Sequence, residues 1–258
     1  MKNKIISIFG ILVLLGGLVL GGIGIKRCLN EANAGESYEE LKVELDIPPL
    51  QEIPEAEEQL ENPIDFKTLK AKYPDVYAWI RIPGTKVDYP IAQRAGEDED
   101  DYYLHHTLDG RKRLEGAIYT ESLNSKDFTD PNTVIYGHNM KNGSMFKTLH
   151  KYKDKKFFSE NSEIFIYMEG KILRYKIFAA YLYDDRHLLK SFDFNDENIF
   201  RIYLNNVLTN KKMSSNMDMM VKVSENDRII TLSTCDARDN QRYLVQAVLL
   251  SIQESPQE

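Results

Sequence analysis

Three residues of this sequence have the side chains that acyl transfer through sulfur requires: Cys235, His138 and Arg242. A cysteine can act as nucleophile, a histidine can carry a proton, and an arginine can stabilise the oxyanion that forms when a carbonyl is attacked. Each lies at the end of an apolar run that favours a β-strand, where a side chain is held most firmly. The pattern predicts a cysteine active site. The alternative is a structural thiol, since a lone cysteine in an apolar run is more often a core residue.

The stretch 229–250 reads as two strands joined by a short polar turn. Such a hairpin would place the thiol of Cys235 and the guanidinium of Arg242 on adjacent strand ends, and a nearby cation favours the thiolate form of a cysteine. Ser233 and Thr234 directly precede the cysteine and could shape a substrate-binding surface. In the alternative interpretation, Arg242 is a strand-edge charge that pairs with an aspartate of the turn, Asp236 or Asp239.

The second constellation covers residues 132–146, where a short strand delivers His138. Gly137 would relax the backbone just before the histidine, and Asn142-Gly143 would turn the chain into a helix over residues 144–152. His138 could instead be a surface loop residue. The sequence contains no HExxH, no CxxC and no glycine-rich phosphate loop, so neither a metal site nor a cofactor is predicted.

The composition is that of a globular protein, with 42% hydrophobic and 28% charged residues. The net charge of −7 argues against nucleic acid as a partner, because phosphate-binding surfaces are usually basic. Two cysteines cannot build a disulfide framework, and a free thiol in an exported domain is consistent with a catalytic role.

An uncharged apolar run of 21 residues, 5–25, is long enough to cross a membrane as a helix. We expect a membrane anchor over residues 1–27; a signal peptide cleaved after 32–34 is the alternative. Cys28 could be palmitoylated, although an unmodified residue is the simpler interpretation. The acidic, proline-containing stretch 28–62 is expected to be an extended tether, because it cannot bury enough apolar surface to fold alone.

The remainder, 63–258, has the length of one domain. Helical spacing of apolar residues begins near residue 64, with Asn62 or Asp65 available as the N-cap, and a second helix is expected over 195–210. Strands are expected over residues 76–82, 87–91, 116–120, 133–136, 164–168, 172–183 and in the closing hairpin. Many short strands with few helices indicate a mostly β barrel or sandwich with peripheral helices.

The segments TLSTC, with an arginine opening the following strand, and YGHNMKNGSMF resemble the paired motifs of the sortases, most closely those of class B. The resemblance covers about residues 64–252 and implies an eight-stranded β-barrel with added helices. Carried over to this sequence, it makes Cys235 the nucleophile, His138 the general acid/base and Arg242 the arginine at the substrate or oxyanion. The seven residues from cysteine to arginine are fewer than is common in class B, so Arg238 is a rival for the arginine.

The resemblance further implies a single-pass protein of a Gram-positive cell membrane, with its catalytic domain outside the cytoplasm. Its partners would be surface proteins that carry a C-terminal sorting signal. It would cleave that signal through a thioester and pass the acyl group to an amine of a cell-wall precursor or of a pilin. Two alternatives stay open: a cysteine hydrolase, and a non-catalytic anchored receptor for a peptide or haem.

Overall fold

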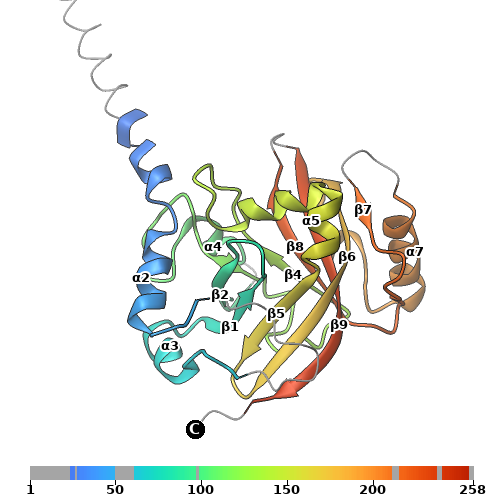
Figure 1. The fold of residues 1–258 in the computed structure, drawn as a ribbon, viewed down its shortest axis with the longest axis horizontal. Helices are drawn as coiled ribbons and strands as arrows, with labels where there is room; N and C mark the ends of the chain where they lie inside the picture. The colour runs from blue at the N-terminus through green and yellow to red at the C-terminus, as the bar shows by residue number, and fades with distance from the viewer. Residues whose placement is uncertain are drawn as a thin grey trace, which may run out of the picture.

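A closed β-barrel forms the centre of the molecule (Figure 1). The computed structural model describes residues 24–26, 28–49, 61–96, 99–210, 215–236 and 240–255. Within these ranges the strands follow the order β5-β1-β2-β3-β4-β8-β9-β6, and β6 pairs back onto β5, which closes an eight-stranded barrel. Strand β7 pairs with β6 at Ala179 and Ala180, beyond the part of β6 that pairs with β5. The strands are β1 (Val76–Arg81), β2 (Asp88–Ala92), β3 (Ile118–Tyr119), β4 (Asn132–Tyr136), β5 (Glu163–Met168), β6 (Lys171–Asp184), β7 (Asn216–Met217), β8 (Ile229–Cys235) and β9 (Gln241–Glu254). The barrel predicted from the resemblance is confirmed.

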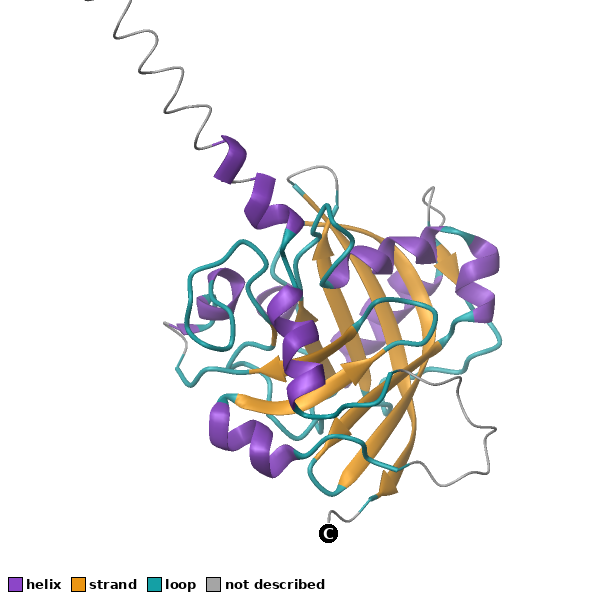
Figure 2. Ribbon diagram, turned by 60° about the vertical axis from the view of Figure 1, so that its left-hand side comes forward, coloured by secondary structure: helices purple, strands orange, loops and turns teal. Residues whose placement is uncertain are grey.

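Helices surround the barrel, as Figure 2 shows. They are α2 (Glu36–Glu44), α3 (Phe66–Lys72), α4 (Tyr102–His105), the 3-10 helix η2 (Phe146–Lys153), α5 (Lys155–Glu160), α6 (Leu188–Ser191) and α7 (Glu197–Leu208). The side chain of Asp65 accepts a hydrogen bond from the Thr68 N–H, so Asp65 is the N-cap of α3. The helix predicted over 144–152 is a 3-10 helix that begins only at Phe146, because Met145 has a φ of 55° and lies outside the helical region.

The strands that carry the candidate site are buried on both faces. In β8, Ile230 and Leu232 face the core inside the barrel, whereas Ile229 belongs to a second apolar cluster, which also contains Phe200 and Tyr203 of α7. Successive side chains of a strand point to opposite faces, so α7 covers the outer face of the sheet. A register shift of one residue would move the barrel-facing side chains of β8 to the outer face and the outer ones to the interior. Because both faces are buried, this requirement fixes the register of β8.

The N-terminal part of the stretch predicted to be an extended tether is folded against the barrel. Residues 36–44 form α2, and Tyr38 and Leu41 are buried at 2% and 4% exposure. The prediction of an extended chain is wrong for residues 28–49, because a segment that cannot fold alone can still bury its few apolar side chains on a neighbouring domain. Residues 50–60 lie outside the described part of the chain.

The predicted membrane anchor falls almost wholly on residues that the structure does not describe. No helix in the described ranges is long and apolar enough to cross a membrane. Cys28 is exposed and forms no disulfide.

Candidate active site

The candidate residues come from three strands that lie side by side in the barrel. Strand β8 pairs in parallel with β4, where Tyr136 lies opposite Ser233, and the Gly137 N–H donates to the Ser233 carbonyl at 3.1 Å. On its other side β8 pairs with β9 in antiparallel register, and Cys235 lies directly opposite Arg242. Directly opposed residues share one face of a sheet. The same strand ends therefore present the thiol, the guanidinium and the residue after Gly137, which is His138.

Cys235 and Arg242 are in contact through their side chains. The Arg242 Nη1 donates to the Cys235 Sγ at 3.3 Å. The sulfur, the guanidinium and the imidazole of His138 all line one cavity of about 220 Å³. Cys235 is half-buried, and it lines this cavity rather than lying in the core. The sequence predicted this convergence, and the structure brings all three residues together.

Ser233 and Thr234 line the same cavity and are themselves buried, at 6% and 2% exposure. The Thr234 Oγ1 is buried and has no hydrogen-bond partner among the residues that the structure describes. A buried hydroxyl without a partner is costly. By alternation along β8, Thr234 lies on the same side as the core residues Ile230 and Leu232, whereas Ser233 shares the face of Cys235.

His138 is held by a backbone carbonyl across the cavity. Its Nε2 lies 2.7 Å from the Leu104 carbonyl oxygen, which can only accept, so Nε2 carries a proton and Nδ1 is left to exchange one. Burial lowers the pKa of His138, and the hydrogen bond to Leu104 opposes that effect. The neutral imidazole is thus the favoured resting form near neutral pH.

Gly137 is required for a reason other than the predicted relaxed backbone. A Cβ at this position would lie 2.5 Å from the Ile118 side chain and 2.7 Å from the Phe146 ring. Its φ is not positive, so what matters is the close packing of β3 and η2 on either side of the chain just before His138.

Two residues that sequence reasoning missed anchor the backbone of the nucleophile. The Cys235 carbonyl accepts from Asn139 Nδ2 at 2.9 Å and from His150 Nε2 at 3.1 Å. Burial lowers the pKa of His150, with Lys153 acting in the same direction. Asn139 directly follows His138, so one loop carries the histidine and tethers the cysteine. The sequence shows that Asn139 follows His138, but it does not indicate that Asn139 or His150 contacts the backbone of Cys235.

The surroundings of Asp236 bear on the alternative role of Arg242. Asp236 lies 2.7 Å from Lys153 Nζ, and the arginine contacts sulfur. Asp239 and the rival arginine, Arg238, fall on residues 237–239, outside the described ranges.

A hydrogen-bonded pair of side chains, His187 and Glu121, forms another part of the cavity wall. The Nε2 of His187 lies 2.6 Å from Oε2 of Glu121, and the Tyr136 hydroxyl donates to the same oxygen at 3.4 Å. Burial raises the pKa of Glu121, against the lowering effect of His187. His187 stands alone in the sequence, and nothing there indicates its distant partner. No group of His, Cys, Asp and Glu side chains in the described ranges could hold a metal ion.

The arrangement suits acyl transfer by a cysteine. A half-buried thiol contacts a permanent cation, and a histidine with one free nitrogen lines the same cavity. The fold and the site together define a β-barrel thiol acyl-transferase.

Comparison with known proteins agrees. The sortase domain family matches residues 80–250. Sortase B of Listeria monocytogenes is 38% identical over 72% of this chain and 74% of its own length. The crystal structure of Clostridium perfringens sortase B has a TM-score of 0.64 at 33% identity and covers 72% of this chain and 99% of that one. A class B sortase of Streptococcus pyogenes involved in pilus biogenesis has a TM-score of 0.61 at 27% identity, over 74% of this chain and 100% of that one.

The chain therefore belongs to the sortase family, as a cysteine transpeptidase of class B.

Proposed function

We propose that this transpeptidase cleaves a C-terminal sorting motif of exported proteins through a thioester on Cys235, and that it transfers the acyl group to an amine of a cell-wall precursor or a pilin. The observation that carries the proposal is the 3.3 Å contact between the Arg242 guanidinium and the Cys235 sulfur, in a cavity that His138 also lines.

In the first half-reaction, the Cys235 thiol gives its proton to Nδ1 of His138, and the resulting thiolate attacks the carbonyl carbon of a threonine in a short motif that contains proline and threonine. A sulfur–carbon bond forms and the carbonyl electrons move to oxygen, where Arg242 stabilises the negative charge. When the oxyanion collapses, the carbon–nitrogen bond breaks and protonated His138 gives its proton to the departing amine. The acyl group is then held as a thioester.

In the second half-reaction, the acceptor amine attacks the thioester and the carbon–sulfur bond breaks. His138 takes up the proton that the amine loses and passes it to the Cys235 sulfur, which restores the thiol and the neutral imidazole. The pilus-associated relative from Streptococcus pyogenes supports a pilin amine as one acceptor, beside a cell-wall amine.

We also propose that residues 1–27 anchor the protein in the cell membrane with the barrel on its outer side. This rests on the apolar run 5–25 in the sequence. Protease added to intact cells should then digest the catalytic domain, and carbonate washing should leave the protein in the membrane fraction. Release by carbonate would contradict the anchor.

The experiment that tests the reaction is incubation of the full chain in detergent with a panel of sorting-motif peptides, with and without triglycine, followed by mass analysis of the products. We expect cleavage after the threonine, and a ligated product only when the amine is present. Cys235→Ala should form neither product while keeping its circular dichroism spectrum.

Cleavage without ligation at any amine concentration would identify a cysteine hydrolase instead. Full turnover by Cys235→Ala would remove the thiol from the mechanism. Binding of peptides without cleavage, together with an unreactive thiol, would identify the non-catalytic receptor.

A further inference from the structure

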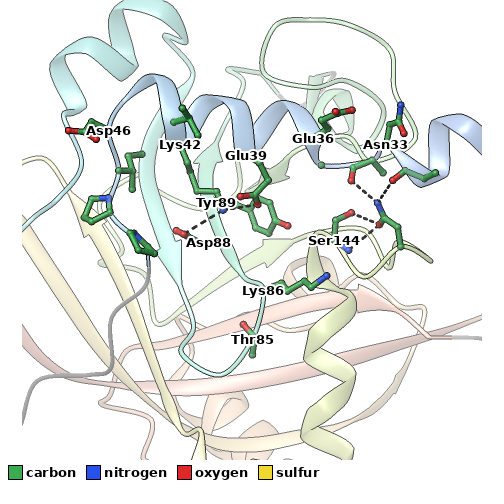
Figure 3. A pocket seen from close by; sticks show the side chains of 18 residues that line it. Asn33, Glu36, Glu39, Lys42, Asp46, Thr85, Lys86, Asp88, Tyr89 and Ser144 are labelled. Atoms are coloured by element: carbon green, nitrogen blue, oxygen red, sulfur yellow. Dashed lines mark hydrogen bonds and ion pairs between the residues drawn. The ribbon is translucent and has the colours of Figure 1, made fainter.

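The loop that carries His138 rests against the N-terminal segment. We refer to residues 138–146 as the histidine loop and to residues 28–49 as the N-terminal strap. The Phe146 N–H donates to the His138 carbonyl at 2.9 Å, so the histidine loop is closed at its base. Figure 3 shows Ser144, near the tip of this loop, facing the turn that precedes α2, and Tyr89 next to α2.

Asn142 joins the two segments. Its Nδ2 donates to the Ala34 carbonyl at 2.7 Å and to the Ala32 carbonyl at 3.2 Å, both in the strap. Its Oδ1 accepts from the N–H and the hydroxyl of Ser144, at 3.1 and 2.7 Å, within the loop. The first helical residues of the strap end in a turn at residues 33–35. Carbonyls at the end of a helix lack intrahelical partners, so they are available to the Asn142 amide. The Asn142 side chain thus binds the turn of the strap and the tip of the histidine loop at the same time.

Close packing accompanies this bond. Gly35 of the strap has a φ of +86°, and a Cβ there would lie 2.9 Å from the Ser144 Cβ. Only glycine satisfies both the backbone and the space at this position.

A second contact acts at the other side of the loop and is buried. The Met145 N–H donates to the hydroxyl oxygen of Tyr89 at 3.0 Å, and the rings of Tyr89 and strap residue Tyr38 form a T-shaped pair, with centroids 5.5 Å apart. Met145 is a non-glycine residue at a φ of 55° and a ψ of −133°, a strained conformation that persists only where its surroundings hold it. The Tyr89 hydroxyl is one such restraint.

We propose that the N-terminal strap positions the catalytic histidine, with Asn142 and Tyr89 as positioning residues of the histidine loop. The base of this loop carries His138 and also Asn139, which binds the Cys235 carbonyl at 2.9 Å. The strap is the segment that follows the predicted anchor, so the geometry links the membrane-proximal chain to the catalytic pair through one loop. The inference rests on the proposed function only for its turnover measurement.

The test compares four variants of the full chain in detergent, all in a Cys28→Ser background. Asn142→Asp keeps the acceptor for Ser144 but loses the donor to the strap, so it isolates the link between the segments. Tyr89→Phe keeps the ring and loses the hydroxyl. The double variant combines them. Lys141→Ala is the control for an exposed contact: its ion pair with Glu31 also joins the loop to the strap, but it is exposed to solvent and such pairs contribute little.

We expect Asn142→Asp and Tyr89→Phe each to lower kcat for the best sorting-motif peptide by about fivefold to tenfold, with KM within about twofold. Amide exchange in 138–146 should quicken at least fivefold while exchange in β8 stays unchanged. The double variant should exceed either single one, and Lys141→Ala should match the parent.

Wild-type kcat and wild-type exchange in both single variants would overturn the proposal. Faster exchange throughout the barrel would also overturn it, because that shows loss of stability rather than of positioning. If no peptide is turned over, the proposed substrate is wrong, and the exchange measurement, with the rate of Cys235 alkylation by iodoacetamide, still decides the role of the strap. Unchanged exchange and alkylation in the double variant would then refute it.

Discussion

Replacement of Arg242 tests its proposed role at the oxyanion directly. In the structure its Nη1 is 3.3 Å from the Cys235 sulfur, so it lies beside any carbonyl that the sulfur attacks. We expect Arg242→Gln to lower kcat/KM for the sorting peptide by about 10²-fold to 10³-fold. This variant keeps a planar polar head and removes the charge.

The magnitude follows from the geometry. Two unit charges about 3.3 Å apart interact by about 5 kcal/mol at an effective dielectric of about 20 and by about 1.3 kcal/mol in bulk water. Cys235 and Arg242 are both half-buried, so the loss should lie between these limits. Removal of one oxyanion donor in a protease costs about 2.7–4 kcal/mol, which falls in that interval.

The assay is initial-rate cleavage of one peptide over a range of concentrations, with Arg186→Ala as the matched control. Arg186 reaches the same cavity, but its guanidinium is held by Asp184 at 2.8 and 2.9 Å, so kcat should stay within about threefold. Arg242→Lys should recover only part of the activity, because an ammonium lacks the guanidinium fork. A loss below fivefold in Arg242→Gln, or an equal loss in Arg186→Ala, would refute the oxyanion role.

Three further predictions concern the neighbouring residues. Arg238→Ala should keep kcat/KM within about threefold, and a greater loss than in Arg242→Gln would transfer the oxyanion role to Arg238. Gly137→Ala should lower the free energy of unfolding in urea by about 1–3 kcal/mol, since its Cβ would overlap Ile118 and Phe146, and an unchanged midpoint would contradict that packing. Because burial lowers the pKa of His138, its contribution to stability is complete above a pH of about 6.5 and is lost as the pH falls below that value, where the unfolded chain binds the proton first. His138→Gln should therefore lose less stability than wild type between pH 7.5 and 5.5 in urea titrations; parallel losses would contradict the lowered pKa.

Local patterns in the sequence were sufficient for the strands that carry the site. The two apolar runs of β8 and β9, with a polar turn between them, predict a hairpin that opposes Cys235 and Arg242, and the structure has that register. The number of strands and the closure of the barrel came from the family resemblance, because the pairings of β1 with β5 and of β4 with β8 join segments far apart in the sequence and no local pattern predicts them.

Contacts between distant segments could not be predicted in the same way. Tyr38 and Leu41 lie in an acidic stretch with low apolar content, and the surface that buries them is formed by residues far along the chain. The pairing of Glu121 with His187 joins residues 66 apart, and each is unremarkable by itself. Such contacts depend on the assembled fold, so residue types alone do not reveal them.

The thioester on Cys235 can be measured directly as the intact mass of the protein after rapid acid quench during cleavage of a sorting peptide. If Cys235 is the nucleophile, we expect a covalent adduct with the mass of the acyl half of the peptide. Fragmentation should locate this adduct on Cys235, triglycine should remove it, and Cys235→Ala should not form it. Product formation without any adduct on Cys235, or an adduct on another residue, would contradict this role of Cys235.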